Sequence, residues 1–244
     1  MSDQLAQALK NAICEWDAHR YQAKFGHRPK HIGWSGIGSC IGKQVMESRY
    51  YKKEASGHTI RGIFFEEMMK TVFPIGKVID NTYRVEAHNV IVEMEILQFQ
   101  FESEIDIVVQ NLQTGQREVW DWKNTYINNV VDEGTDENIM QVNLSAYKYG
   151  CKTFRLIYGD SIDWLRIVPQ SYQTEEKLAQ ETIERLVYRE ILKLKTEEEL
   201  IAKWSDYAEG LDMIRYTPKR HNEKRPCDYC KIRSLCEKWV GAKP

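Results

Sequence analysis

The segment from Phe101 to Asn124 constrains the fold of this chain more than any other part of its sequence. Ile105, Ile107 and Val109 recur at every second position, as in a half-buried β-strand, and residues 118–123 form a second extended run. Residues 111–116 lie between the two runs and include Gly115, so they favour a tight turn. The sequence therefore predicts a β-hairpin and a sheet that contains it.

Three charged side chains interrupt the apolar runs of this hairpin. Asp106 lies on the first strand, and Asp121 and Lys123 lie at the end of the second. Side chains two positions apart on a strand point to one face, and pairing across the hairpin can bring Asp106 beside them. Carboxylates that hold Mg²⁺ or Mn²⁺ can activate a water, and a nearby lysine can orient it or offset developing negative charge. The pattern is typical of metal-assisted phosphodiester hydrolysis.

An Asp-x-Lys triplet on an exposed strand is more often an ordinary solvated surface. Here, however, two tryptophans flank Asp121 and two isoleucines flank Asp106. A carboxylate among apolar residues costs free energy unless it is paired, and a metal ion is the usual partner. The flanking residues therefore favour a metal site over a solvated strand.

The composition is that of an ordinary globular protein. Of 244 residues, 42% are hydrophobic and 29% charged, which predicts one large domain instead of two independent ones. A net charge of -2 means that contact with DNA would require a local basic groove. No apolar run approaches the length of a membrane span, and the N-terminal residues do not resemble a signal peptide, so we expect a cytoplasmic protein.

The rest of the chain alternates between helical and extended patterns. Helices are expected at 2–25, 40–51, 60–73, 136–149, 174–195 and from 196 onward, and strands at 78–85, 90–96, 101–109, 118–123, 154–158 and 164–168. In the third helix, Phe64, Phe65, Met68 and Met69 are expected in the core. This order of elements predicts an α/β fold in which helices cover a mixed central sheet.

The C-terminal tail carries a second motif, Cys227, Cys230 and Cys236 in the spacing C-x2-C-x5-C. In a reducing compartment such cysteines argue for metal ligation before disulfides. Tetrahedral thiolate coordination requires a fourth ligand, and zinc and an iron-sulfur cluster both accept four thiolates. The candidates for the fourth ligand are Cys14, Cys40, Cys151 and His221.

The hairpin and the tail together resemble the RecB-type nucleases of the PD-(D/E)xK superfamily, specifically their iron-sulfur branch. That branch includes CRISPR-associated RecB-like exonucleases, the AddB nuclease domain and related phage exonucleases. The resemblance covers residues 35–239. It implies a restriction-endonuclease-like core inside a helical envelope that the cluster staples together. The whole chain, 1–244, would be one nuclease domain with an N-terminal helical part (1–60), the core (61–170) and C-terminal helices with the cysteine-rich tail (171–244).

The resemblance also implies roles for particular residues. A [4Fe-4S] cluster would be bound by Cys40, Cys227, Cys230 and Cys236, and Mg²⁺ or Mn²⁺ by Glu66, Asp106, Asp121 and the backbone carbonyl of Trp122, with Lys123 assisting catalysis. The basic residues beside the cysteines could guide a phosphate backbone, or they could form a solvated tail. They are Lys219, Arg220, Lys224, Arg225, Lys231 and Arg233.

The sequence departs from the family pattern at two places. RecB-type nucleases usually have a His four residues after a helix glycine; here that position, after Gly62, is Glu66, as in the lambda-exonuclease type. His58 is the second choice for this role. The family's Q-x-x-x-Y motif is loosened, because Ser145 lies four residues after Gln141 and Tyr147 two residues later. Contact of Gln141 and Tyr147 with DNA is the weaker inference, since both residues suit an ordinary packed helix.

The expected function is a metal-dependent DNA exonuclease that acts from single-stranded ends in DNA end processing, recombination or phage DNA metabolism. Intact Asp106, Asp121 and Lys123 favour an active enzyme. A first alternative is a nucleic-acid-binding or assembly module that keeps the fold and the cluster but has weakened catalysis. A second is a zinc-stapled scaffold without a nucleic-acid function, which would lack the absorption of an iron-sulfur protein.

Overall fold

The computed structural model describes residues 11–13, 15, 16, 19, 32–50, 57–125, 134–159, 165–167 and 171–200. Its helices are α2 (Ile41–Tyr50), α3 (Gly57–Val72), α4 (Asp136–Tyr149) and α5 (Glu176–Leu194). Its strands are β1 (Ile32–Gly33), β2 (Val78–Ile79), β3 (Tyr83–Ile96), β4 (Phe99–Asn111), β5 (Arg117–Asn124), β6 (Thr153–Gly159), β7 (Leu165–Ile167) and β8 (Tyr172–Gln173). The order of elements confirms the predicted α/β class.

The strands form one mixed sheet in the order β2-β3-β4-β5-β6-β7, with β1 pairing to β4 and β8 to β6. The neighbours β5 and β6 are parallel, and α4 makes the crossover between them. The strands β3 and β4 form a long antiparallel hairpin, and β4 and β5 form the hairpin predicted from residues 101–124. The centre of the sheet therefore carries both strands on which the charged residues were expected.

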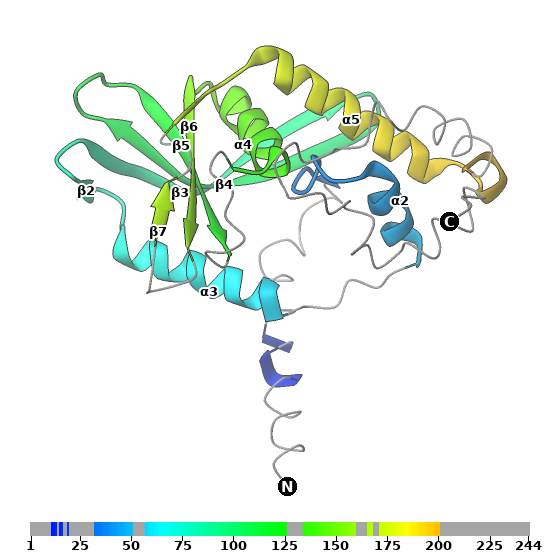
Figure 1. Ribbon diagram of the computed structural model, residues 1–244, viewed down its shortest axis with the longest axis horizontal. Helices are drawn as coiled ribbons and strands as arrows, with labels where there is room; N and C mark the ends of the chain where they lie inside the picture. Colours follow the sequence, from blue (N-terminus) through cyan, green and yellow to red (C-terminus); the bar gives the residue numbers. More distant parts are fainter. Residues whose placement is uncertain are drawn as a thin grey trace, which may run out of the picture.

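Helices cover both faces of this sheet (Figure 1): α3 lies against one face, and α4 with α5 lies against the other. The apolar cluster beneath α3, here called the α3-side core, consists of Phe65, Met69, Val85, Ile107, Val109, Trp120, Trp122 and Ile157. The larger cluster on the opposite face, the α4-side core, includes Trp34, Phe101, Ile105, Val108, Val119, Leu144, Phe154, Leu156 and Leu186. Alternate residues of β5 thus serve opposite faces, as the two-residue period of a strand requires.

The ends of α4 follow from local chemistry. Thr135 adopts an extended conformation and its hydroxyl accepts a hydrogen bond from the N–H of Asn138, so it caps the first turn. Asp136 and Glu137 add negative charge where the helix dipole favours it. Gly150 ends the helix at φ 80°, the left-handed conformation that glycine adopts without strain. These caps determine where α4 begins and ends.

The predictions were wrong in two details. The expected strands 78–85 and 90–96 are not separate units, because Asp80 and Asn81 turn the chain at φ 49° and 50° and β3 then runs without interruption from Tyr83 to Ile96. Phe64 is not a core residue, since 54% of its surface is exposed. Its neighbour Phe65 is only 3% exposed, because adjacent helical residues point in directions about 100° apart.

Several predictions concern residues outside those that the structure describes. They include most of the N-terminal helix, Cys14, the residues from 201 onward with Cys227, Cys230 and Cys236, and the basic residues of the tail. The division of the chain into three parts also remains a prediction. None of the helices described here combines the length and apolarity that a membrane span requires.

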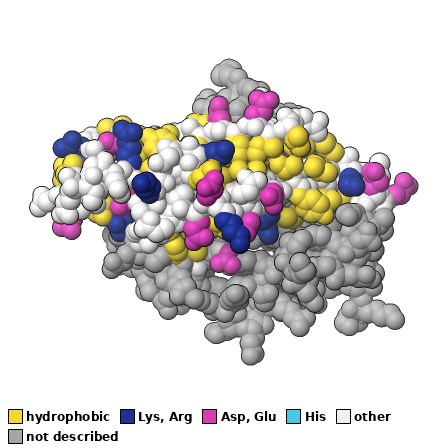
Figure 2. All heavy atoms as spheres, turned by 90° about the horizontal axis from the view of Figure 1, so that it is seen from above, with side chains coloured by type: hydrophobic (Ala, Val, Ile, Leu, Met, Phe, Trp, Pro, Cys, Tyr) yellow, Lys and Arg dark blue, Asp and Glu magenta, His cyan; other side chains and the backbone are white. Residues whose placement is uncertain are grey.

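Figure 2 views the molecule from the side on which α5 lies. Hydrophobic side chains gather in a broad area of this face, and Lys and Arg alternate with Asp and Glu around it. The described part of this face therefore carries no patch made of Lys and Arg alone. A local basic groove for DNA would have to be formed elsewhere on the chain.

Candidate active site

The hairpin β4–β5 brings its charged residues together by backbone geometry. The two strands pair from Ile107–Trp120 toward the turn. Immediately beyond this ladder, the carboxylate of Asp106 accepts a hydrogen bond from the backbone N–H of Trp122 at 2.7 Å. The side chain of Asp106 therefore continues the pairing of the strands at the point where backbone pairing stops.

Asp121 and Lys123 lie two positions apart on β5 and share one face, as predicted. The Lys123 ammonium contacts Oδ2 of Asp121 at 2.7 Å, and Asp121 is only 4% exposed. Lys123 Nζ also donates to Oε1 of Gln141 on α4, at 3.4 Å. Both residues thus point to the face of the sheet that α4 covers, while Trp120 and Trp122 belong to the α3-side core.

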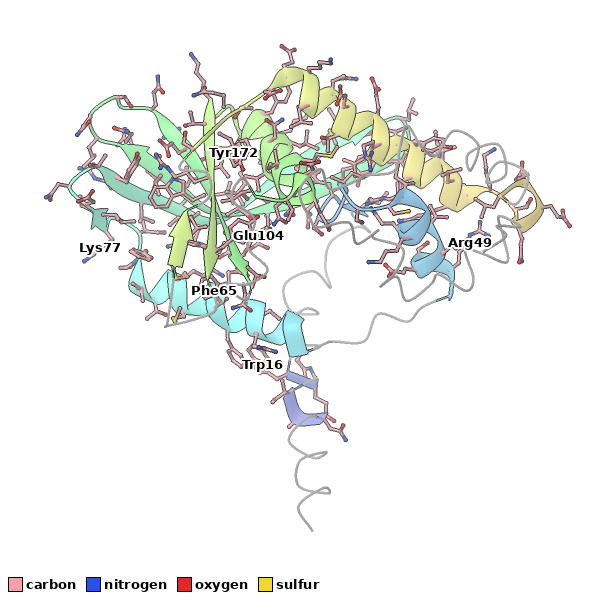
Figure 3. The ribbon with its side chains drawn as sticks, viewed as in Figure 1. Trp16, Arg49, Phe65, Lys77, Glu104 and Tyr172 are labelled. Carbon is pink, nitrogen blue, oxygen red and sulfur yellow. The ribbon has the colours of Figure 1, made fainter. Side chains whose placement is uncertain are left out.

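Glu66 approaches the same region from α3. Its Oε1 contacts the ammonium of Lys70 at 2.7 Å, one helical turn away, and accepts a hydrogen bond from the carboxamide of Asn89 on β3 at 3.0 Å. The same carboxamide donates to Glu104 of β4, which Figure 3 labels near the centre of the molecule. We call Glu66, Asp106, Asp121 and Lys123 the charged cluster, because they come from three separate elements and the charge of Glu66 acts on both aspartates.

Electrostatics couple the members of this cluster. Burial raises the pKa of Asp106 well above its usual value, and the charge of Asp121 raises it further. Burial also raises the pKa of Asp121, although Lys123 opposes the shift, and Glu66 adds to the pKa of both aspartates. Burial lowers the pKa of Lys123, but the charges of Asp121 and Asp106 outweigh this effect, so its net pKa is raised. The cluster holds more negative charge than it can neutralise alone.

A divalent cation suits this environment. Carboxylate and backbone carbonyl oxygens are hard ligands of the kind that Mg²⁺ and Mn²⁺ prefer, and a cation would replace the protons that the buried aspartates otherwise retain. Among the described residues, however, no three His, Cys, Asp or Glu side chains are already gathered closely enough to hold a metal ion. Binding of a cation would therefore draw these carboxylates closer together, and the contacts with Lys70 and Asn89 set the position from which Glu66 starts.

The structure separates the two residues of the loosened Q-x-x-x-Y motif. Gln141 reaches Lys123, whereas the hydroxyl of Tyr147 donates to Glu176 of α5 at 3.3 Å. Six positions along a helix turn a side chain by about 600°, so Gln141 and Tyr147 cannot share a face. Ser145, which occupies the family position of the tyrosine, is buried and accepts a hydrogen bond from the indole N–H of Trp34. The side chain of His58 is not among those described.

Two residues beside the cluster had no place in the sequence predictions. Glu104 lies two positions before Asp106, and this period-two spacing is a signal that could have indicated it. Asn89 gave no comparable signal, because its contact with Glu66 joins segments 23 residues apart. A contact between a helix and the side of a strand depends on packing that no local pattern specifies.

Comparison with known proteins adds independent evidence. The family model described as the PD-(D/E)XK nuclease superfamily matches residues 44–237, which is more than half of the chain. No curated protein matches with significant similarity. The crystal structure of SSO0001 superposes with a TM-score of 0.56 and 14% sequence identity, covering 93% of this chain and 96% of that one, and it shows a likeness of fold alone. The mixed sheet flanked by helices and the extent of the family match agree: the chain belongs to the PD-(D/E)XK nuclease superfamily.

Proposed function

We propose that this protein is a metal-dependent DNA exonuclease that hydrolyses phosphodiester bonds from single-stranded ends. Membership of a superfamily of nucleases supports the reaction class. The observation that carries the proposal is the buried contact set of Asp106, Asp121 and Lys123, in which the N–H of Trp122 and the ammonium of Lys123 orient the two carboxylates. Paired carboxylates beside a lysine are typical of sites for metal-assisted hydrolysis.

Each residue has a distinct part in this proposal. Asp106, Asp121, Glu66 and the backbone carbonyl of Trp122 would hold Mg²⁺ or Mn²⁺, which supplies Lewis acidity to the phosphate and lowers the pKa of a bound water. The charges of Asp121 and Asp106 raise the pKa of Lys123, which favours its ammonium form, and this ammonium would offset the negative charge that develops on the phosphate.

Gln141 of α4 contacts the catalytic lysine of this proposal, Lys123. Its Oε1 accepts from the Lys123 ammonium, so α4 limits the positions that the ammonium can adopt. A lysine that is held in this way loses less conformational freedom when the substrate arrives. We therefore assign Gln141 to the orientation of Lys123, and leave direct contact with DNA as a separate prediction for Gln141 and Tyr147.

A [4Fe-4S] cluster bound by Cys40, Cys227, Cys230 and Cys236 is part of the same proposal. Of the candidates for the fourth ligand, Cys40 is exposed immediately before α2, whereas Cys151 is 5% exposed within the α4-side core. Burial raises the pKa of the Cys151 thiol to about 11, which disfavours the thiolate that a metal needs. Ligation by Cys40 would tie α2 to the C-terminal tail and restrict the unfolded chain.

The decisive assay uses end-labelled and internally labelled DNA, single- and double-stranded, with Mg²⁺ or Mn²⁺. The wild type should release nucleotides from single-stranded ends and leave circular single strands intact, while Asp121→Ala purified in parallel should be inactive. Equal cleavage by wild type and Asp121→Ala would show a contaminating nuclease or a different site. Cleavage of circles would change the proposal from exonuclease to endonuclease.

The proposed iron-sulfur cluster is tested separately from catalysis. Iron content, absorption near 400 nm and melting temperature should fall together in Cys40→Ser and in each of the three tail variants. Cys151→Ser should retain iron, because its thiol is buried in the core. Iron that persists in Cys40→Ser, or zinc in place of iron in the wild type, would refute this ligand set.

One observation favours the alternative function, a nucleic-acid-binding or assembly module with weakened catalysis. RecB-type nucleases usually have a histidine at the position of Glu66. Here the Glu66 carboxylate contacts Lys70 and Asn89. A protein of this kind would bind single-stranded DNA in a filter or anisotropy assay without degrading it at any Mn²⁺ concentration. The cleavage assay therefore decides between the two functions.

A further inference from the structure

Asn89 has a left-handed backbone conformation although it does not lie in a turn. Its φ is 53°, in the left-handed region that few side chains other than Asn and Asp adopt readily. The other described non-glycine residues with positive φ are Asp80, Asn81 and Leu97, and all of these lie in turns between strands. Asn89 instead lies inside β3. Strained conformations within regular elements persist where the surrounding structure imposes them, and they occur preferentially at functional sites.

Asn89, the residue with the irregular backbone, lies opposite Asp106. The pairs His88–Ile107 and Val90–Ile105 place Asn89 and Asp106 at opposite positions of the β3–β4 ladder. The alternation of side chains changes on both strands at this level. On β4, Ile105 and Val108 both pack into the α4-side core, although residues three apart on a regular strand face opposite sides. The distortion at Asn89 is therefore part of the geometry that presents Asp106.

The same backbone conformation directs the carboxamide of Asn89 at two carboxylates. Its Nδ2 donates to Oε1 of Glu66 on α3 at 3.0 Å and to Oε1 of Glu104 on β4. Lys70 also contacts Glu66 Oε1, but it is on the same helix as Glu66 and cannot fix the position of this carboxylate relative to the sheet. The hydrogen bond from Asn89 ties the Glu66 carboxylate to β3, the strand that faces Asp106.

We propose that Asn89 is a positioning residue, which ties the Glu66 carboxylate to β3 and so limits how far it must move to share one divalent cation with Asp106 and Asp121, and that Glu104 anchors the Asn89 carboxamide. This inference rests on the proposed metal-dependent nuclease function. Because an amide has two N–H groups, Asn89 can donate to both carboxylates at once, and the acceptor on Glu104 prevents rotation of the amide away from Glu66. Residues that orient metal ligands typically affect metal affinity by about 10- to 100-fold.

The test measures Mn²⁺ binding to the full-length protein by calorimetry, without DNA. Asn89→Gly keeps the left-handed backbone and removes the carboxamide. Asn81→Gly is the matched control, because it makes the same substitution at φ 50° in the exposed β2–β3 turn. Mn²⁺ affinity should fall about 10- to 100-fold in Asn89→Gly and stay at the wild-type value in Asn81→Gly.

A second pair of variants separates an anchor from a metal ligand. Glu104→Ala removes the acceptor for the Asn89 amide and should weaken Mn²⁺ binding without any change to the backbone at position 89. Glu104→Gln keeps an Oε1 acceptor and should retain the affinity. If Glu104→Gln binds Mn²⁺ as poorly as Glu104→Ala, Glu104 is itself a ligand and the proposed anchor role is wrong. This pair decides the matter even if Asn89→Gly does not fold.

The outcome also distinguishes this inference from the proposed function. Asp121→Ala should lose Mn²⁺ binding, which establishes that the measured site is the charged cluster. Normal affinity in Asn89→Gly and Glu104→Ala, combined with loss in Asp121→Ala, would refute the role of Asn89 and leave the nuclease function intact. A wild-type protein that binds no Mn²⁺ would refute the metal-dependent function itself.

Discussion

The backbone N–H of Trp122 donates a 2.7 Å hydrogen bond to the Asp106 carboxylate, so one aspartate both pairs two strands and contributes charge to the site. These two roles can be separated. An asparagine at position 106 retains an oxygen that accepts from Trp122, whereas it removes the negative charge beside Asp121. An alanine removes both.

We expect Asp106→Asn to abolish cleavage and to stabilise the metal-free protein at neutral pH. Burial and Asp121 raise the pKa of Asp106 in the folded state, so the folded protein retains a proton that the unfolded chain releases above about pH 4. The contribution of Asp106 to the stability of the metal-free wild type therefore falls as the pH rises from about 4 to the raised pKa, and it stays lost above that pKa. The variant has no such loss and should gain roughly 1–3 kcal/mol at pH 8.

Thermal melting in EDTA between pH 4 and pH 8 measures this difference. The melting temperature of Asp106→Asn minus that of the wild type should increase with pH, and Mn²⁺ should raise only the wild type. Asp106→Ala is the control for the lost hydrogen bond and should melt below Asp106→Asn at each pH. A metal-free wild type that is more stable than Asp106→Asn at pH 8 would show that the charge of Asp106 costs nothing in the fold.

Lys123 tunes the protonation of Asp121. Its ammonium opposes the rise in the pKa of Asp121 that burial causes. Lys123→Met should therefore raise that pKa further, so the midpoint of pH-dependent Mn²⁺ binding should move to higher pH, and the cleavage rate should fall about 100-fold or more. Lys123→Arg keeps the charge and should restore most of the binding midpoint. An unchanged midpoint in Lys123→Met would mean that Lys123 does not interact with the ionised carboxylate.

The sequence could predict the hairpin and its charged residues because the relevant signals are local. The alternating strand residues, the turn at Gly115 and the three charged residues all lie within 24 residues of sequence. The turn and the alternation together determine which residues pair across the hairpin. The structure confirms the pairing and the common face of Asp121 and Lys123. Their roles as metal ligands and catalytic lysine remain predictions, because a hydrogen bond or an ion pair does not identify the ion that the site would bind.

The surroundings of Glu66 could not be predicted in the same way. Its contact with Asn89 depends on how α3 packs against β3 and on the left-handed backbone of Asn89. A single asparagine within a strand pattern does not predict such a backbone. Helical periodicity also could not decide which of Phe64 and Phe65 faces the sheet. Both residues fit an apolar stripe, and only the packing of α3 over the tryptophans of β5 selects Phe65.

Gly38 allows a close approach between the loop before α2 and the first turn of α4. A Cβ at this position would lie 2.2 Å from Cα and 2.7 Å from the backbone nitrogen of Glu137. Since backbone atoms cannot move aside locally, Gly38→Ala should shift α4 and lower the free energy of unfolding by about 1–3 kcal/mol. Because α4 carries Gln141, cleavage should also decrease.

Gly62 provides the matched control for this prediction. It lies in the interior of α3, and a Cβ there would meet no atom within 4 Å among the described residues. Gly62→Ala should therefore raise the free energy of unfolding by about 0.5–1 kcal/mol, because alanine favours a helix more than glycine does. Chemical denaturation of the two variants measures both effects. If Gly38→Ala were as stable as Gly62→Ala, the close approach of the two backbones would be refuted.

Phe64 and Phe65 give the sharpest test of how α3 lies on the sheet. Phe65 is 3% exposed and packs in the α3-side core with Trp120 and Trp122, so Phe65→Ala should lower the free energy of unfolding by about 3–5 kcal/mol. Phe64 is 54% exposed and stacks on Trp16 with ring centroids 5.7 Å apart, so Phe64→Ala should cost about 1 kcal/mol. A double-mutant cycle of Phe64→Ala with Trp16→Ala should give a coupling of about 0.5–1.5 kcal/mol. Equal losses in Phe64→Ala and Phe65→Ala, measured by urea denaturation, would contradict the orientation of α3 that brings Glu66 to the charged cluster.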